Sequence, residues 1–507
     1  MTAERDARGP VTVAMVLSIV AAMVAVRSVT DASLVRMVLV MAIALILTVP
    51  LGAVLARWVL PSGSSAHQRV GLTIGLGYAV APLMLLFTAR FGMLGLLAPM
   101  WVAVVWFLVR RMRGRRARPK PSSAASDVYK RQVEGSPEEA ASVVATIAAL
   151  SVALVTPFMH PIREVTSVLS VNYAYIDTYF HTNLVQALMR HTPLAEWPNV
   201  AGMPPIFYQD FHHLWLASLA RLARVSANEM YVLYAPVMLV VFTVVLAYAV
   251  GRAMTCSRVG GYLAAALQYI VLVPNLYDRN WALRGEWSVV LPNFYQIHFY
   301  NLRYAQHAAS GWIVLLALVL CWSLALRPSA SEVKWRAMAA AGLLLAVLFR
   351  VRPQYFLVMV PPTAVLTLWV GRRQPAVLAA TALAGAAALA LVLYPYDTLG
   401  TNSSGLVLKY GVFAARVSRA GYFLPNAVTR VFAYLPALAR PAVGLALILV
   451  LRIIGVNLVV LLALGARRLR QWRGGWLDRI ESCEVLDVAV VDRSARPRDL
   501  TEAWFAE

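Results

Sequence analysis

The feature that most limits how this chain can fold is a series of apolar stretches, each about as long as a bilayer is thick. A membrane-spanning helix needs about 20 mostly apolar residues, and somewhat fewer when its ends are polar or it packs within a bundle. Twelve stretches are candidates, although those that begin at Gly260 and Ala337 are short: Val11–Val26, Met37–Ala56, Gly71–Thr88, Gly92–Val109, Ala141–Met159, Met230–Val250, Gly260–Val273, Ser310–Leu326, Ala337–Phe349, Gln354–Val370, Ala376–Leu393 and Ala442–Ala466. The pattern predicts an all-α polytopic membrane protein with about twelve transmembrane helices.

The composition argues against an ordinary soluble protein. Only 14% of the 507 residues are charged and 60% are hydrophobic, whereas a soluble protein carries about 25% charged residues. The net charge of +22 would suggest nucleic-acid binding in a soluble chain. Here the arginines lie between apolar stretches, where they orient a membrane protein. We therefore expect no nucleic-acid partner.

The basic connections between the stretches indicate which side faces the cytoplasm. Strongly basic segments follow the fourth, eighth, tenth and twelfth stretches, and they read RRMRGRRARPKP, RPSASEVKWR, GRR and RRLRQWR. All four fall on the cytoplasmic side if the N-terminus is cytoplasmic, as the positive-inside rule requires. The sequence therefore predicts that both termini are cytoplasmic and that three long connections lie outside: Pro161–His212, Pro274–Ala309 and Tyr394–Pro441.

The chain divides into four regions by composition. Residues 1–126 hold four stretches, 127–140 form a cytoplasmic linker, 141–466 hold the other eight, and 467–507 form a basic and then acidic cytoplasmic tail. Within the linker, Asp127–Gln132 reads DVYKRQ, which is a translation of the transposon mosaic-end DNA used to prepare sequencing libraries. We interpret it as an adapter remnant, with an ordinary polar cytoplasmic linker as the alternative, so the first region could come from another gene. Separately, the acidic end from Trp476 to Glu507 is interpreted as a cytoplasmic tail or a frame-shifted end.

The first outer connection contains Asp177 and His181, in the stretch VNYAYIDTYFHTNLVQALMR. Residues four apart lie on one face of a helix, so the two side chains would be neighbours just beyond a predicted span. A carboxylate there could act as a general base toward a hydroxyl, or hold a divalent metal ion together with His181. The alternative is an acid at a helix N-terminus, which the helix dipole favours without any chemistry.

The same connection ends in GMPPIFYQDFHH, Gly202–His213. Its two consecutive prolines enforce an extended path, and the aromatic rings beside them could lie against a sugar. We therefore expect Tyr208, Asp210 and His212 to contact substrate, although a rigid turn explains the prolines equally well. The following segment, His213–Arg224, is amphipathic and too short to span, so we expect it to lie in the membrane interface.

Several basic side chains fall on the predicted outer side. Arg350 and Arg352 lie between the ninth and tenth stretches, and His298 and Arg303 lie in the second outer connection. The positive-inside rule disfavours arginine outside, so the pair at 350 and 352 indicates an anionic partner, and guanidinium groups suit bidentate phosphate contacts. We expect all four residues to bind substrate. The alternative for the arginines is that they extend toward lipid headgroups.

Together, the outer connections offer carboxylates, histidines, aromatic rings and arginines. That set suits transfer of a sugar from a lipid phosphate to a hydroxyl. A base would accept the proton, arginines would stabilise the departing phosphate, and aromatic rings would hold the sugars. The sequence contains no phosphate-binding glycine loop, His-Glu-x-x-His or nucleophile-elbow motif, and each of these would have indicated a different chemistry.

The segments IDTYFHTNLVQALMR and GMPPIFYQDFHHLWLASLARL resemble the GT-C glycosyltransferases, and within them the N-terminal membrane region of actinobacterial galactan arabinofuranosyltransferases. The resemblance covers about residues 140–410, and the matching residues are Asp177, Phe180, Gly202, Pro204, Pro205, Tyr208 and Trp215. It implies a GT-C-like fold with short interfacial helices outside the bacterial plasma membrane, a polyprenyl-phosphate sugar as donor, and Asp177 as the catalytic acid or base. The family carries a large extracytoplasmic C-terminal domain, whereas here a tail that we place inside follows the last stretch.

Two hypotheses of different classes remain. The leading one is an inverting glycosyltransferase that uses a lipid-linked sugar donor in the membrane and a cell-envelope polysaccharide acceptor. The alternative is a transporter or flippase of lipid-linked saccharides, which should carry ionisable residues at mid-membrane and show inverted repeats. The predicted spans are nearly free of charge, with Arg452 as the main exception, so the sequence favours the enzyme. A scaffold for other envelope enzymes also stays open.

Overall fold

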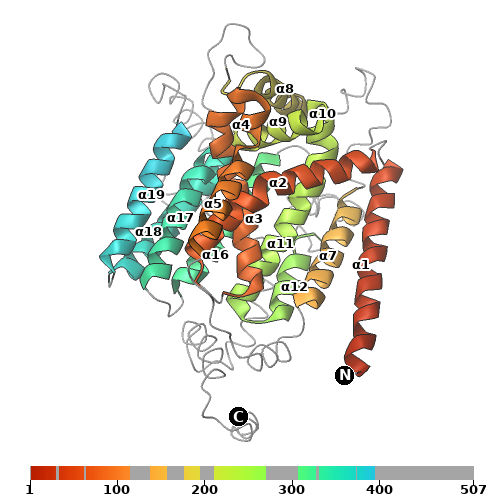
Figure 1. The fold of residues 1–507 in the computed structure, drawn as a ribbon, viewed down its shortest axis with the longest axis horizontal. Coiled ribbons are helices and arrows are strands. Elements are labelled where there is room, and N and C mark those ends of the chain that lie inside the picture. Colours follow the sequence, from red (N-terminus) through yellow and green to blue (C-terminus); the bar gives the residue numbers. More distant parts are fainter. Residues whose placement is uncertain are drawn as a thin grey trace, which may run out of the picture.

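The computed structural model describes residues 2–29, 33–61, 64–114, 137–156, 176–194, 210–269, 306–326, 331–372 and 374–393. These ranges are helical apart from short turns, and they contain no strand (Figure 1). The helices are α1 (Thr2–Val29), α2 (Leu34–Val59), α3 (Ala66–Thr88), α4 (Gly92–Leu96), α5 (Ala98–Gly114), α7 (Pro137–Val155), α8 (Ile176–Arg190), α9 (Phe211–Ala223), α10 (Ala227–Glu229), α11 (Ala235–Thr255), α12 (Arg258–Ala266), α16 (Gln306–Leu326), α17 (Ser331–Val351), α18 (Pro353–Gly371) and α19 (Pro375–Leu393). Two short elements complete the list: η1 (Ala89–Phe91) and the π-helical turn η4 (Met230–Tyr234).

The expectation of a helical membrane protein is confirmed. Among the described residues, four helical segments are long and apolar enough to cross a membrane: Leu34–Val59, Ala66–Leu96, Ala227–Thr255 and Gln306–Leu326. Each of the first eleven predicted stretches overlaps a described helix, with the fourth divided between α4 and α5 and the seventh only partly covered by α12. The twelfth, Ala442–Ala466, lies outside the described residues, so the number of spans stays a prediction.

Ion pairs and hydrogen bonds show which helix ends lie together. At one end, Arg36 at the start of α2 pairs with Glu229 of α10 at 3.3 Å. At the other end, Arg336 near the start of α17 donates to the carbonyl of Trp58 at the end of α2. The helices α8, α9 and α10 gather at the first end, opposite the N-terminus of α1 (Figure 1). We call this the α8–α10 end of the bundle.

The core of the α8–α10 end is α9, which is buried on all sides. Every residue from Phe211 to Ala220 is at most 1% exposed, because α2, α3, α8, α16 and α17 all pack against it. Most of His213–Arg224 therefore packs inside the protein, whereas we expected an amphipathic helix that lies against lipid. The polar residues that make this segment look amphipathic are hydrogen-bonded inside the bundle: Ser218, for example, donates to the carbonyl of Leu214 at 2.9 Å.

Two glycines allow α2 and α3 to cross in backbone contact. A Cβ atom on Gly52 would lie 1.7 Å from the carbonyl oxygen of Thr73, and one on Gly77 would lie 2.0 Å from that of Thr48. Small residues permit this approach between membrane helices, where close packing drives association. The next residue along α3, Tyr78, extends from this crossing into the α8–α10 end, so the crossing helps to position the site described below.

Candidate functional site

The structure brings five of the predicted site residues together at the α8–α10 end: His181, Asp210, His212, Arg350 and Arg352. Asp177 lies in the first turn of α8 with His181 one turn further along the same helix, as expected. The Asp177 side chain lies outside the described part of the chain, and so do Tyr208, His298 and Arg303.

Arg350 and Asp210 form a buried, bidentate ion pair. The Nε and Nη2 groups of Arg350 donate to Oδ1 and Oδ2 of Asp210, at 2.6 and 2.9 Å. The two side chains are 0% and 2% exposed, and the guanidinium carbon lies 4.6 Å from the ring centroid of Phe211. The anion that Arg350 needs is therefore supplied by the chain itself. This corrects the interpretation that Arg350 awaits a substrate phosphate or extends toward headgroups, and it places Asp210 in a structural pair.

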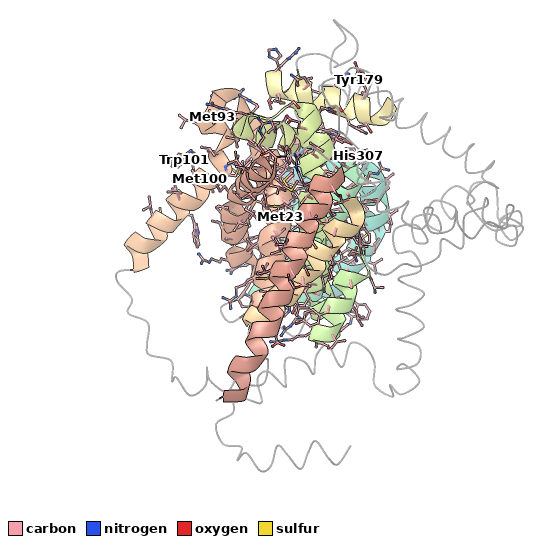
Figure 2. The ribbon with its side chains drawn as sticks, turned by 90° about the vertical axis from the view of Figure 1, so that its right-hand side faces the viewer. Met23, Met93, Met100, Trp101, Tyr179 and His307 are labelled. Carbon is pink, nitrogen blue, oxygen red and sulfur yellow. The ribbon has the colours of Figure 1, made fainter. Side chains whose placement is uncertain are left out.

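Three histidines from three helices meet beside this pair. His181 of α8, His213 of α9 and His307 of α16 are all buried, and one nitrogen from each lies within 4.8 Å of the other two. The Nε2 of His213 is 2.9 Å from the Nδ1 of His181, and their rings stack with centroids 4.9 Å apart. Figure 2 shows His307 inside the bundle below Tyr179, which is exposed on α8. We call these residues the three-histidine cluster.

Tyr231 packs against the cluster, and Gln306 holds the turn that contains Tyr231. The ring of Tyr231 is stacked on those of His181 and His213, at centroid distances of 5.7 and 6.3 Å. Tyr231 lies in η4, and π-helical turns of this kind are frequent at functional sites because they redirect side chains. Gln306 donates its amide to the carbonyl of Tyr231, which ties the start of α16 to this turn.

Arg352 contacts the cluster through His307. Its Nη1 donates to the Nε2 of His307, because a guanidinium has only donors. The Nδ1 of a neutral His307 therefore carries the ring proton, an assignment that follows from the hydrogen bond. This Nδ1 is buried and has no hydrogen-bond partner among the described residues. Buried polar groups are rarely left without a hydrogen-bond partner. This Nδ1 therefore makes His307 the unsatisfied member of the cluster.

His212 belongs to a separate network that joins three helices. Its Nδ1 lies 3.1 Å from the hydroxyl of Tyr78 on α3, and its Nε2 lies 3.4 Å from Oε1 of Gln306 on α16. The Tyr78 hydroxyl is also hydrogen-bonded to the hydroxyl of Ser310, at 2.7 Å. Both nitrogens of His212 are thus engaged by the protein, and its side chain is buried. The structure thus shows His212 in contacts between helices, and its expected contact with substrate stays a prediction.

Burial keeps two of these histidines uncharged. Burial, together with the smaller effect of the nearby charge of Arg352, lowers the pKa of His181 to about 4. Burial also lowers the pKa of His212 to about 3, against the opposing effect of the hydrogen bond to Gln306 and with a smaller contribution from His181. Near neutral pH both are neutral imidazoles, which can donate and accept hydrogen bonds, and those with an accessible lone pair can bind a metal ion.

Sequence reasoning missed several residues of this site: Tyr78, His213, Tyr231, Gln306 and His307. A signal existed for the two histidines, because histidine is concentrated in and beside the predicted outer connections. The tyrosines and Gln306 gave no such signal, since each lies in an apolar helix or beside one and is brought to the site only by helix packing.

Comparison with known proteins adds no assignment. No protein-family model matches the chain, and no curated protein or solved structure is similar to it. The resemblance to arabinofuranosyltransferases therefore rests on its sequence motifs. Of the motif residues with described side chains, Phe180 lies against His181 at a centroid distance of 5.4 Å, and Trp215 is buried edge-to-face against Tyr78 at 4.9 Å.

Proposed function

We propose that the chain is an inverting glycosyltransferase, which moves a sugar from a polyprenyl-phosphate donor to a cell-envelope glycan on the outer face of the membrane. The resemblance suggests arabinofuranose as the sugar. One observation supports the proposal most: α8, whose first turn contains Asp177, packs on the end of the bundle where His181, His307 and Arg352 converge. The helix that carries this acid thereby packs on a group of imidazoles and a guanidinium at one end of an apolar bundle, where a lipid-linked substrate could present its phosphate.

Each group has a role in the proposed reaction. The carboxylate of Asp177 accepts the proton of the acceptor hydroxyl as its oxygen bonds to the anomeric carbon. The bond from that carbon to the phosphate oxygen breaks at the opposite face, and polyprenyl phosphate leaves with the electron pair. Arg352 stabilises the charge that develops on the phosphate. His181, one turn from Asp177, donates a hydrogen bond to the phosphate or the sugar.

Replacement of one oxygen of Asp177 tests the proposal. Asp177→Asn keeps the shape of the side chain but removes its basicity, and loss of a general base typically lowers the rate by about 10²–10⁴. We expect sugar transfer from a synthetic polyprenyl-phosphate sugar by the purified protein to fall by this factor, while donor binding persists. Glu229→Gln is the matched control, since it makes the same chemical change in an acid on the neighbouring α10. An Asn variant that transfers sugar at the wild-type rate contradicts the proposal.

A transporter or flippase of lipid-linked saccharides remains the second candidate. The buried ion pair of Asp210 and Arg350 favours it, because buried ionisable residues between membrane helices often mark a transport path. Proteoliposomes distinguish the two functions. Movement of a labelled lipid-linked saccharide between leaflets by a protein that transfers no sugar to any acceptor would support the transporter and exclude the enzyme.

A further inference from the structure

We propose that His181, His213 and His307 bind one divalent transition-metal ion, with Zn²⁺ as the preferred occupant. The proposal depends only on the three-histidine cluster, and it stands whether the chain transfers sugar or transports it.

The positions of the nitrogens are close to those that a metal ion requires. Zinc binds histidine nitrogen at about 2.0–2.1 Å in tetrahedral geometry, so two such ligands lie about 3.3 Å apart. In the cluster, the His213 and His181 nitrogens are 2.9 Å apart, and all three candidate ligand atoms lie within 4.8 Å of one another. To reach tetrahedral spacing, each distance between two nitrogens must change by no more than about 1.5 Å, the difference between 4.8 and 3.3 Å. The helices α8, α9 and α16 therefore already place the ligands.

The chemistry of the ligand set selects the ion. Three imidazole ligands suit zinc, copper and nickel, whereas magnesium and calcium require oxygen ligands. Three protein ligands also leave a fourth position for water or a substrate oxygen, which is the arrangement of catalytic zinc sites. We therefore expect an open site and not a closed structural one. All three histidines are buried, so weak binding at the protein surface would not explain one bound ion per chain.

Arg352 competes with the metal ion for His307. The Nε2 of His307 accepts a hydrogen bond from Arg352, so a metal ion on this nitrogen must displace the guanidinium. A metal ion on Nδ1 would require the ring proton to move to Nε2, where it would face another donor. Either route ends the contact between Arg352 and His307. Metal binding therefore releases Arg352, and removal of the guanidinium should favour the metal.

Two simpler explanations of the cluster exist, and one observation weighs against each. A hydrogen-bonded stack of imidazoles that binds nothing would leave no buried nitrogen unsatisfied, yet the Nδ1 of His307 has no partner among the described residues. An anion site would need N–H groups to converge, yet the short contact between His213 and His181 pairs a donor with an acceptor.

Metal binding by the purified full-length chain tests the proposal. After treatment with a chelator, Zn²⁺ is titrated in competition with a chromophoric chelator, and Co²⁺ is added separately to record its visible absorption. We expect one ion per chain and an intense cobalt spectrum of tetrahedral type. His213→Ala and the milder His307→Gln should weaken binding by at least about 100-fold. His191→Ala, which changes an exposed histidine at the end of α8, should leave binding unchanged.

Arg352→Gln provides the sharper test, because a merely structural cluster predicts no gain. Loss of a neighbouring positive charge and of a competing donor should tighten zinc binding by on the order of 10-fold. Absence of stoichiometric zinc from the wild-type protein overturns the proposal, and so does equal binding by the wild type and both histidine variants. If those variants do not fold, an octahedral or absent cobalt spectrum of the wild type overturns it. Stabilisation by inorganic phosphate but not by zinc would instead identify an anion site.

Discussion

Arg350 donates two hydrogen bonds to the carboxylate of Asp210 across 140 residues of sequence, and neither side chain is exposed to solvent by more than 2%. The pair joins the last turn of α17 to the residue that precedes α9. It therefore fixes the helix that carries His212 and His213 to a helix that crosses the bundle. A buried pair of this kind is costly to form, but it is more costly to break on one side only.

The first prediction concerns this pair. Arg350→Met or Asp210→Asn alone should destabilise the protein by about 3–5 kcal/mol, because each leaves its partner buried and unpaired. The double variant should recover much of that loss. The effect is measured by thermal unfolding in detergent, in which size-exclusion chromatography quantifies the protein that stays folded at each temperature. Arg36→Met is the control, since its pair with Glu229 is largely exposed and such pairs contribute only about 0–1 kcal/mol. Equal effects at both pairs would contradict the prediction.

The second prediction concerns Arg352 and the phosphate of the proposed donor. A charged hydrogen bond to phosphate contributes about 1.5–3 kcal/mol, so Arg352→Gln should weaken donor binding by on the order of 10- to 100-fold. Donor affinity is measured with the purified protein and a labelled polyprenyl-phosphate sugar. Arg372→Gln, an arginine at the far end of α18 that lies over Trp369, should leave affinity unchanged. If Arg352→Gln binds donor as tightly as the wild type, the phosphate lies elsewhere.

The third prediction concerns sidedness. The charge pattern predicts that the α8–α10 end lies outside the cell, so a cysteine at Thr192, just after α8, should react with a membrane-impermeant thiol reagent in intact cells. A cysteine at Ser123, in the predicted cytoplasmic linker, should react only after the cells are opened. Both variants are made after removal of the three native cysteines. The reverse labelling pattern would invert the topology and remove the basis for an outer-face enzyme.

The fourth prediction concerns pH. The folded protein lowers the pKa of His181 to about 4 and that of His212 to about 3, because both are buried. The unfolded chain, with histidine pKa values of about 6.5, therefore binds more protons than the folded one below that pH. Stability should be fully present above pH 6.5 and should fall as the pH is lowered toward 4. His212→Gln should flatten this fall when unfolding is measured across the range. A pH-independent midpoint in the wild type would show that neither histidine is buried neutral.

The fifth prediction concerns the hydroxyl of Tyr78. Tyr78→Phe keeps the aromatic contact with Trp215 but removes the group that bonds Ser310 and His212. Unpaired buried polar groups cost about 1–3 kcal/mol, so the unfolding midpoint should drop measurably. Tyr179→Phe makes the same change at an exposed position on α8 and should have little effect. A Tyr78→Phe variant as stable as the control would show that His212 finds other partners.

The length and apolar character of single stretches were enough to predict the helices, because each spanning helix satisfies its own backbone and needs no distant partner. They misplaced α9 for the same reason. Its histidines look like polar residues of an interfacial helix until Tyr78, Gln306 and His307 are brought to them from α3 and α16. The partner of Arg350 was equally hidden, since nothing local to residue 350 indicates Asp210. What the sequence could not predict was the side-chain chemistry between helices.

The contact of α2 with α3 has a mechanical consequence. At Gly52 and Gly77 the two backbones touch without side chains between them, so neither helix can slide or rotate past the other without separation along the crossing. The two helices therefore form one rigid pair, and the hydrogen bond between Tyr78 and His212 fixes the position of His212 relative to this pair. A hinge that opens the α8–α10 end to a lipid would therefore have to lie outside the pair of α2 and α3. The helix α8, which packs on α9 and α10, is not part of this pair.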